Sequence, residues 1–497
     1  MTNSAPGVDG FYPSGLMGRQ DPYLQYDEPF QKQVQPGMDP SWVSGPVLDM
    51  SADWAPIDIC TRGTQGLRLG AKYLLPQEPA ETDDAWNRRI SKATLSPFTT
   101  RIADQAAGLI LRKGIQVLPN DYQEVEGAEL DPFWDEFCCS VDGRGTSLRA
   151  FAQKVLISSL LYGHSVILAD MPNVEPAANL REERERGLMP YFAHYDAQQI
   201  LGWRQSDAGP TSPIDQVRFN EIACEPKGQF GTEHLRQIRI VEPGKWQVWR
   251  KNAGGWGIHE EGTTNINKIP VSVAYSNKVA EYVSKPPLLS IANLNVRHAQ
   301  ANCDLGHALH VSALPILLLK GFDDSDTEGT IGLSANSAIL LPTDGDGKFI
   351  EPASSSFDAQ QAYLDRLEEQ MRNLGIATLF AQLNSPETAQ SKQISRIDSD
   401  SLLSSVSRNL ENALQHAFDH AAAYVGKESP KIVIDRDFNL QTLEGNAVGQ
   451  YMNLFNNGVI TQSTLLEILR KGECLPSDFD IELEVELTDQ NQLDAID

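Results

Sequence analysis

The sequence predicts an α+β fold in which helices predominate, and three patterns support that prediction. Residues 386–425 follow a helical repeat without interruption, residues 190–275 hold runs typical of a strand-rich meander, and residues 313–356 form a short strand unit between two helical segments. Apolar side chains at three- and four-residue intervals indicate helix, whereas short β-rich runs separated by turn residues indicate strands.

The long helix begins at a Ser-Pro pair. Ser385 can accept a hydrogen bond from a free backbone N–H, and Pro386 has the backbone geometry of a first helical turn. No Gly or Pro follows until Gly426, and an unbroken helix of about 40 residues would be roughly 60 Å long. A helix of that length needs other elements to pack against. Its apolar stripe consists of Ile394, Ile397, Leu403, Val406, Leu410, Leu414, Phe418 and Ala421.

A second helix precedes it at residues 357–374. Ser355 and Asp358 have the spacing of a capping box, and Gly375 is expected to end the helix. Its apolar stripe is Leu364, Leu367, Met371 and Leu374. With the polar loop that follows, this part of the chain predicts an αα-hairpin within a large helical domain.

The remaining elements are predicted in order along the chain. Residues 1–54, rich in Gly and Pro with isolated aromatic residues, are expected to form an extended arm without a core of its own. The others are helices at 84–111, 147–161 and 286–312, strands at 165–170 and 431–434, a helical pair at 442–454 and 461–469, and an alternating, half-exposed strand at 480–488.

Length and composition narrow the class of protein. The 497 residues are 41% hydrophobic and suffice for several cores, and no apolar run approaches the roughly 18–20 residues of a membrane span. The first residues show no signal peptide, and six scattered cysteines are expected to be reduced. We therefore expect an intracellularly made protein that does not use membranes. A net charge of −26 argues against a basic face that grips nucleic acid, although nucleic acid could still slide past.

No motif for catalysis is found. The phosphate-binding loop, the nucleophile elbow, the HExxH helix and the EF-hand loop are all absent from the sequence, so we expect no enzyme, no catalytic residue and no cofactor. Cys303, His307 and His310 share one face of the predicted 286–312 helix, which leaves a zinc enzyme as an alternative. A polar helical stripe facing a lumen or another subunit is the preferred interpretation, with no metal.

The order of these parts resembles the portal proteins of tailed double-stranded DNA bacteriophages. Residues 73–114, which begin YLLPQEPAETDDAWNRRI, resemble the opening of the outer domain in one portal family. Residues 284–321 (SKPPLLSIANLNVRHAQ onward) resemble the helix entering the narrow end of the portal. Residues 355–375 and 385–396 resemble the returning helix and the segment after the channel loop. The resemblance covers about residues 55 to 490.

The resemblance implies a wing, stem, clip and crown architecture that assembles as a ring, usually of twelve copies. The implied parts follow the chain in sequence order. They are an arm (1–54), wing (55–285), stem helix (286–312), clip (313–356), returning stem helix (357–374), tunnel loop (375–390), long wing helix with its following strand (386–435), and crown (436–497).

It also implies a function, a location and partners. The ring would lie at one vertex of the capsid, assembled in the host cytoplasm, and DNA would enter through it during packaging and leave through it on infection. The implied partners are the terminase motor, head-completion and tail proteins, capsid and scaffold proteins, and the DNA itself. The implied tunnel-loop residues are Gln382, Asn384, Ser385, Gln390, Lys392 and Arg396. The implied clip residues that dock partners are Phe322, Asp323, Asp324, Asp344, Asp346 and Lys348.

The composition suits such a channel. Tight phosphate binding would hold the duplex in place, whereas an acidic wall repels it and keeps it centred. We hypothesise that uncharged polar loops form a soft collar that follows the DNA and resists its slipping back. One structural alternative remains, a capsid-associated adaptor or scaffold protein without a DNA channel.

Overall fold

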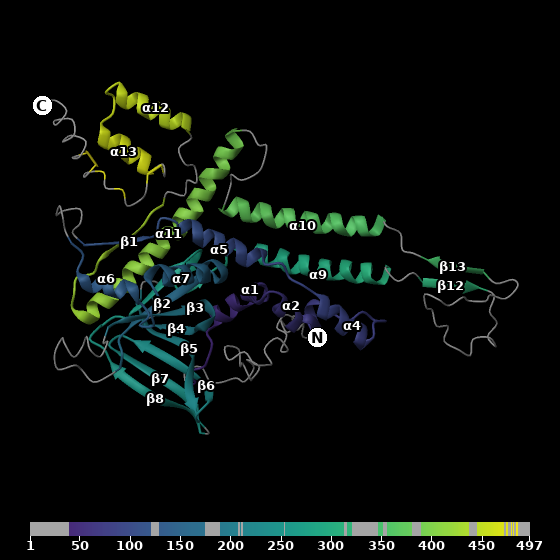
Figure 1. Ribbon diagram of the computed structural model, residues 1–497. Coiled ribbons are helices and arrows are strands. Elements are labelled where there is room, and N and C mark those ends of the chain that lie inside the picture. The colour runs from purple at the N-terminus through teal and green to yellow at the C-terminus, as the bar shows by residue number, and fades with distance from the viewer. Residues whose placement is uncertain are drawn as a thin grey trace. The chain divides into compact units, whose positions relative to one another are not determined.

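The computed structural model describes residues 39–120, 129–173, 189–206, 209, 212–252, 254–312, 316–320, 346–350, 355–379, 389–436, 445–471, 474–475, 479, 481 and 484–485. It is 49% helical and 25% strand, which confirms the α+β class (Figure 1). The chain divides into two compact units, an N-terminal unit of residues 1–435 and a C-terminal unit of residues 436–497.

The N-terminal unit begins with helices where the sequence predicted an arm. Helix α1 spans Gly45–Arg62 and buries Val47, Met50 and Trp54. The expectation of an extended arm as far as residue 54 is therefore wrong, because these side chains have helical spacing and Pro46 occupies the first turn, where its missing N–H is not needed. Residues 1–38 of the predicted arm lie outside the described residues. The next four helices are α2 (Thr64–Leu69), α3 (Ala71–Leu74), α4 (Asp83–Lys92) and α5 (Phe98–Ile110).

A helix and a buried strand form the centre of the N-terminal unit, as predicted. In α7 (Leu148–Tyr162) the hydroxyl of Ser147 accepts from Ala150 N–H, and the helix ends at Gly163, whose φ of 92° suits only glycine. Strand β2 (His164–Asp170) follows directly and is buried along its whole length. It pairs antiparallel with β3 (Tyr191–Asp196) on one side and β9 (Val271–Tyr275) on the other.

The predicted meander is a five-stranded antiparallel sheet in the order β4-β5-β6-β7-β8. Gly254 lies in the turn between β7 and β8. The strands are β4 (Ile200–Gln205), β5 (Ile214–Lys227), β6 (Gly231–Glu242), β7 (Lys245–Asn252) and β8 (Gly255–Thr263). Short elements elsewhere in this unit are β1 (Ile115–Leu118), α6 (Pro132–Cys139), a 3-10 turn (Ala197–Gln199), β10 (Lys278–Ala280) and β11 (Val283–Ser284).

A buried ion network lies between the two sheets. The guanidinium of Arg239 on β6 lies 2.7 Å from a carboxylate oxygen of Glu221 and 3.2 Å from one of Asp170. The hydroxyl of Tyr195 donates to Glu221, and that of Tyr191 donates to Asp170 over 3.1 Å. Burial raises the pKa of Asp170 above its ordinary value, and Arg239 opposes that rise. Arg239 is thus the cation that the two carboxylates share.

The long helix is α11 (Ala389–Val425), of 37 residues. It ends at Gly426, with φ of 65°, as predicted. Its Phe418 is fully buried, and the ring lies 5.4–5.6 Å from those of Trp134, Phe137 and Phe192. Strand β14 (Lys431–Ile434) then pairs with β1. This helix thus packs against elements distant in sequence.

The C-terminal unit contains the predicted helical pair, α12 (Gly445–Asn456) and α13 (Gln462–Lys471). The predicted strand at 480–488 is wrong in its described residues, because Ile481, Glu484 and Val485 are helical. Acidic and aliphatic residues alternate there with a period of two, which is typical of a strand. Ile481 and Val485 are also four residues apart, however, so they share one face of a helix.

Candidate functional site

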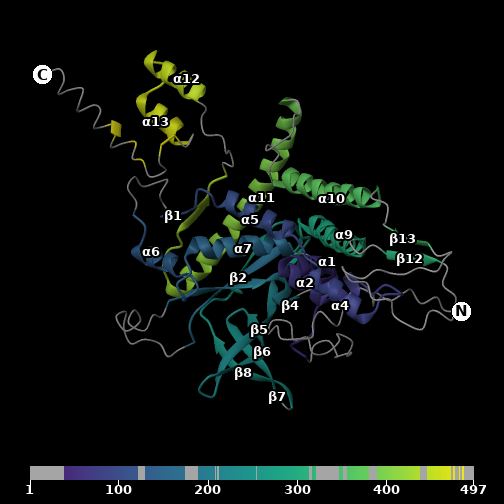
Figure 2. The same ribbon diagram turned by 45° about the vertical axis from the view of Figure 1, so that its right-hand side comes forward.

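The candidate site is a hairpin of two long helices, α9 (Leu289–Ser312) and α10 (Ser355–Leu379). They run side by side in opposite directions, with the strands β12 and β13 at one end (Figures 1 and 2). Both helices were predicted, α9 starting three residues later than expected. At 1.5 Å per residue each is about 36 Å long. The hairpin therefore separates its two ends by that distance.

Helix α9 is fixed to the N-terminal helices by a buried amide. The Oδ1 of Asn295, which is fully buried, accepts from the backbone N–H of Thr99 (3.3 Å) and from its hydroxyl (3.1 Å). Its Nδ2 donates to the carbonyl of Ser96 over 2.9 Å. Nearby, the Cys60 thiol donates to the carbonyl of Ala292, and burial raises the pKa of that thiol to about 11. A buried amide bonded at both ends holds the helix in one position.

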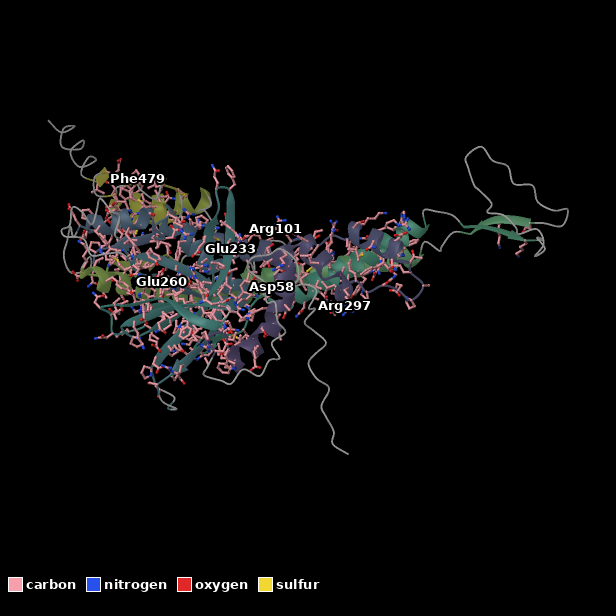
Figure 3. All side chains as sticks on the ribbon, turned by 90° about the horizontal axis from the view of Figure 1, so that it is seen from below. Asp58, Arg101, Glu233, Glu260, Arg297 and Phe479 are labelled. Atoms are coloured by element: carbon pink, nitrogen blue, oxygen red, sulfur yellow. The ribbon has the colours of Figure 1, made fainter. Side chains whose placement is uncertain are left out.

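Two polar contacts join α9 to α10. The guanidinium Nε of Arg297 donates to the hydroxyl of Tyr363 over 2.6 Å. His298 Nε2 lies 3.3 Å from a carboxylate oxygen of Glu368, and the edge of its ring meets Phe98 with centroids 5.7 Å apart. Figure 3 shows Arg297 on the hairpin. The two pairs fix the register of the helices.

Helix α10 is held by one narrow apolar seam. Leu364, Leu367 and Met371 are buried at 4%, 3% and 0% exposure, and most of the other described side chains of the helix are exposed. Gly375 was predicted to end this helix, and that is wrong, because α10 continues to Leu379. A Cβ at Gly375 would lie 2.6 Å from Ile102 Cδ1 on α5. This glycine permits close helix packing.

The exposed face of α10 is polar with little net charge. Its exposed charged residues are the acids Asp358, Asp365 and Glu369 and the bases Arg366 and Arg372. Such a face gives phosphate no concentrated positive charge to bind.

The far end of the hairpin carries a two-stranded antiparallel ribbon. Strand β12 (Ile316–Lys320) pairs with β13 (Asp346–Ile350) from Ile316 opposite Ile350 to Lys320 opposite Asp346. Both strands lie within the strand unit that was predicted at residues 313–356. Residues 313–315, 321–345 and 351–354 of that predicted unit lie outside the described residues.

The structure describes only some of the predicted site residues. Asp346 and Lys348 are exposed on β13. Gln390, Lys392 and Arg396 lie on the first turns of α11. The remaining candidates lie outside the described residues: Gln382, Asn384, Ser385, Phe322, Asp323, Asp324 and Asp344.

The alternative metal site is not assembled. Within the described part of the chain, no group of three or more His, Cys, Asp and Glu side chains could hold a metal ion. Cys303 is buried beside Arg89, which forms two hydrogen bonds of 2.8 and 3.0 Å with the Glu81 carboxylate. Burial raises the pKa of the Cys303 thiol, which disfavours the thiolate that zinc needs, while Arg89 lowers the pKa of Glu81. His307 and His310 are more exposed than Cys303.

Sequence reasoning missed the residues that hold the hairpin together. Arg297, His298 and Glu368 gave no motif, because their partners are about 70 residues away in sequence. The spacing of the apolar seam predicted which face of α10 is buried, but it could not predict what that face meets.

A family model matches one segment of the chain. Residues 287–425 match a family described as a domain of unknown function (DUF4055). This segment runs from just before α9 to the end of α11 and so includes the whole hairpin. No curated protein matches the chain.

The solved structures that match this chain include chains of gene transfer agent (GTA) particles. One is from the virion of the native particle, with 12% identity, a TM-score of 0.37, and 75% of this chain and 88% of that chain covered. A second is from the neck of the empty particle, computed with C6 symmetry, with 11% identity, a TM-score of 0.39, and coverage of 75% and 90%. A third is from the neck of the native particle, computed with C12 symmetry, with 12% identity, a TM-score of 0.38, and coverage of 79% and 94%.

Among the helices that the structure describes, none has the length and apolar character needed to cross a membrane.

Proposed function

We propose that this chain is a portal-type subunit whose copies form a ring around a channel for double-stranded DNA at one capsid vertex. The observation that carries the proposal is the hairpin of α9 and α10, with a strand ribbon at one end and the connection to α11 at the other. That arrangement is the one that the resemblance of the sequence to phage portal proteins implies for stem, clip, tunnel loop and wing helix.

The packing of α10 supports assembly. Among the described side chains of α10, the narrow seam of Leu364, Leu367 and Met371 is buried and most of the others are exposed, so much of this helix is open within one chain. Long helices in water are stabilised mainly by tertiary packing. A head-to-tail contact repeated by a closing rotation gives each copy the same neighbours and produces a ring.

The charge of the hairpin supports passage of DNA. A surface with many exposed Lys and Arg residues would release counterions and bind the duplex tightly, whereas the exposed face of α10 carries three acids and two bases. A weakly charged wall lets the duplex move along the channel. In this proposal the chain catalyses no reaction, and the packaging motor supplies the energy.

The two ends of the hairpin have separate roles. The ribbon of β12 and β13, with Asp346 and Lys348 exposed, would dock the packaging motor and later the head-completion proteins. The connection from α10 to α11 would form the loop that touches DNA, with Gln390, Lys392 and Arg396 on the first turns of α11.

Native mass spectrometry with negative-stain imaging tests the ring. Twelve copies of the 54.8 kDa chain have a mass of about 658 kDa, and we expect closed rings with a central hole near that mass. A chain that stays monomeric, or forms compact dimers without a hole, in the presence of its capsid partners would overturn the proposal and favour the adaptor or scaffold alternative.

A further inference from the structure

One stretch of this acidic chain carries bases and no acid. Residues 143–169 contain no Asp or Glu, although the chain has 67 of them, and their basic side chains include Arg144, Arg149 and Lys154. Arg144 precedes α7, and the other two lie on its first turns. All three are exposed, and in the described part of the chain none of them forms an ion pair. These three residues, here called the α7 cations, are therefore free to bind an anion.

A tight loop holds the backbone of Arg144 ahead of α7. The Asp142 carboxylate accepts from the backbone N–H of Arg144 over 2.9 Å. It also accepts from the N–H and the hydroxyl of Thr146, over 3.1 and 2.6 Å. Gly143 and Gly145 have φ of 67° and 88°, which glycine adopts without strain. The loop thus fixes the point from which the Arg144 side chain extends, while Asp142 is occupied inside the loop.

Helix α7 presents its two cations on one exposed face. Its opposite face is buried, and the ring of Phe151 lies 5.9 Å from that of Phe192 on β3. Arg149 and Lys154 are five residues apart, which is about 7.5 Å along a helix axis. Successive phosphates of one DNA strand are spaced by about 3.4 Å along the duplex axis. A helix lying along the strand therefore brings these two cations to phosphates two steps apart.

The rest of this face favours phosphate over a protein partner. Between the two cations of α7 it exposes Ala150 and Gln153, which are small or uncharged. The exposed large apolar side chains of the described residues all lie outside residues 143–169. Protein interfaces are usually anchored by large buried side chains, whereas phosphate contacts need only cations and hydrogen-bond donors. Charge complementarity therefore points to the backbone of a nucleic acid.

We propose that the α7 cations bind the phosphodiester backbone of duplex DNA, on a face of the subunit formed by α7 and not by the α9–α10 hairpin. The inference rests on the proposed function only in taking duplex DNA as the partner, and it needs neither a ring nor a channel. Three phosphate contacts on a chain with a net charge of −26 give weak binding that salt disrupts. The duplex is held loosely there and is easily released.

Fluorescence anisotropy of a labelled 30-bp duplex, titrated with the full chain at several salt concentrations, tests the contact. Each phosphate contact adds about 0.9 to the slope of log K against log salt. In the triple variant Arg144→Gln/Arg149→Gln/Lys154→Gln we therefore expect the slope to fall by about 2.7, and the affinity at 0.1 M salt to fall roughly 100-fold or more.

A matched triple variant controls for net charge. Lys251→Gln/Lys268→Gln/Lys431→Gln removes three other exposed cations and should change the affinity less than about threefold. Absence of duplex binding by the parent chain, or equal losses in the two triple variants, would overturn the proposal. A poly-glutamate peptide of the same charge is the second probe. If it bound the parent chain as tightly as the duplex does, with the same loss in the α7 variant, an acidic protein would replace DNA as the partner.

Photo-crosslinking locates the contact. A benzophenone amino acid in place of Gln153 should crosslink to the duplex, whereas the same group in place of Asn252, which is exposed on β7, should not. Crosslinking from both positions, or from neither, would contradict the assignment. Rings with a central hole whose DNA binding does not depend on the α7 cations would refute this inference alone. DNA binding that depends on them in a chain that forms no ring would refute the ring alone.

Discussion

Replacing Gly375 by alanine tests whether this glycine is needed for close packing of α10 against α5 or only lowers the helix propensity of α10. In the helix interior, Ala is more favourable than Gly by about 0.8–1.0 kcal/mol. The new Cβ, however, would lie 2.6 Å from Ile102 Cδ1, about 1 Å inside ordinary carbon contact. Overpacking of this kind costs typically 1–3 kcal/mol. We therefore expect Gly375→Ala to destabilise α10 by about 0–2 kcal/mol, the sum of these opposing effects.

A double-mutant cycle with Ile102→Val isolates the contact. Valine lacks the Cδ1 atom, so the added methyl group then has room, although Ile102→Val alone costs about 0.5–1.5 kcal/mol. We expect the double variant to be more stable than the sum of the single effects by about 1 kcal/mol. Hydrogen exchange of the α10 amides measures the free energy of local opening of this helix in each variant. If Gly375→Ala slowed exchange about fivefold, and the two changes were additive, the packing explanation would be refuted.

Three further predictions concern the core, the ion network and the loop. Phe418→Ala should destabilise the protein by about 3–5 kcal/mol, because it empties the centre of the aromatic cluster, whereas Phe230→Ala at a residue 93% exposed should stay within about 0.5 kcal/mol; equal thermal midpoints for both variants would contradict this. Arg239→Met should cost about 3–5 kcal/mol at pH 7, because it leaves Asp170 and Glu221 without their cation. The folded pKa of Asp170, already raised, would rise further, so the variant's deficit should shrink as pH falls toward that pKa, and a deficit that grows on acidification would refute the assignment. Deletion of residues 379–384 should leave rings intact while particles fail to retain their genomes. Unchanged DNA retention would refute the hypothesis that the loops form a collar that resists back-slip of the DNA.

Local patterns predicted most of the secondary structure. Ser147 and Gly163 marked the two ends of α7, and Gly426 marked the end of α11, because caps and left-handed glycines act within a few residues of the helix. The meander was predicted for the same reason, since turn residues and strand runs are local signals.

The errors arose where distant parts of the chain decide the structure. Glycine often ends a helix, but Gly375 lies within α10, where the absence of a side chain leaves room for Ile102 of α5. Residues 45–54 looked like part of an arm because Gly and Pro surround them, yet Trp54 is buried and donates to the carbonyl of Tyr162, 108 residues away. Composition alone does not reveal such partners.

The hairpin site was predictable in its elements and not in its contacts. Apolar spacing predicted α9, α10 and the buried face of α10. The pairs Arg297–Tyr363 and His298–Glu368 depend on the register of two helices that are distant in sequence, which no single-sequence pattern specifies.

A cryo-electron microscopy reconstruction of the purified oligomer, at a resolution that traces helices, tests the central claim most directly. We predict a closed ring in which α9 and α10 of every copy line the central hole and β12–β13 lie at one rim. A ring whose hole is lined by other elements, with the hairpins on its outer surface, would contradict the account, as would a compact particle without a hole.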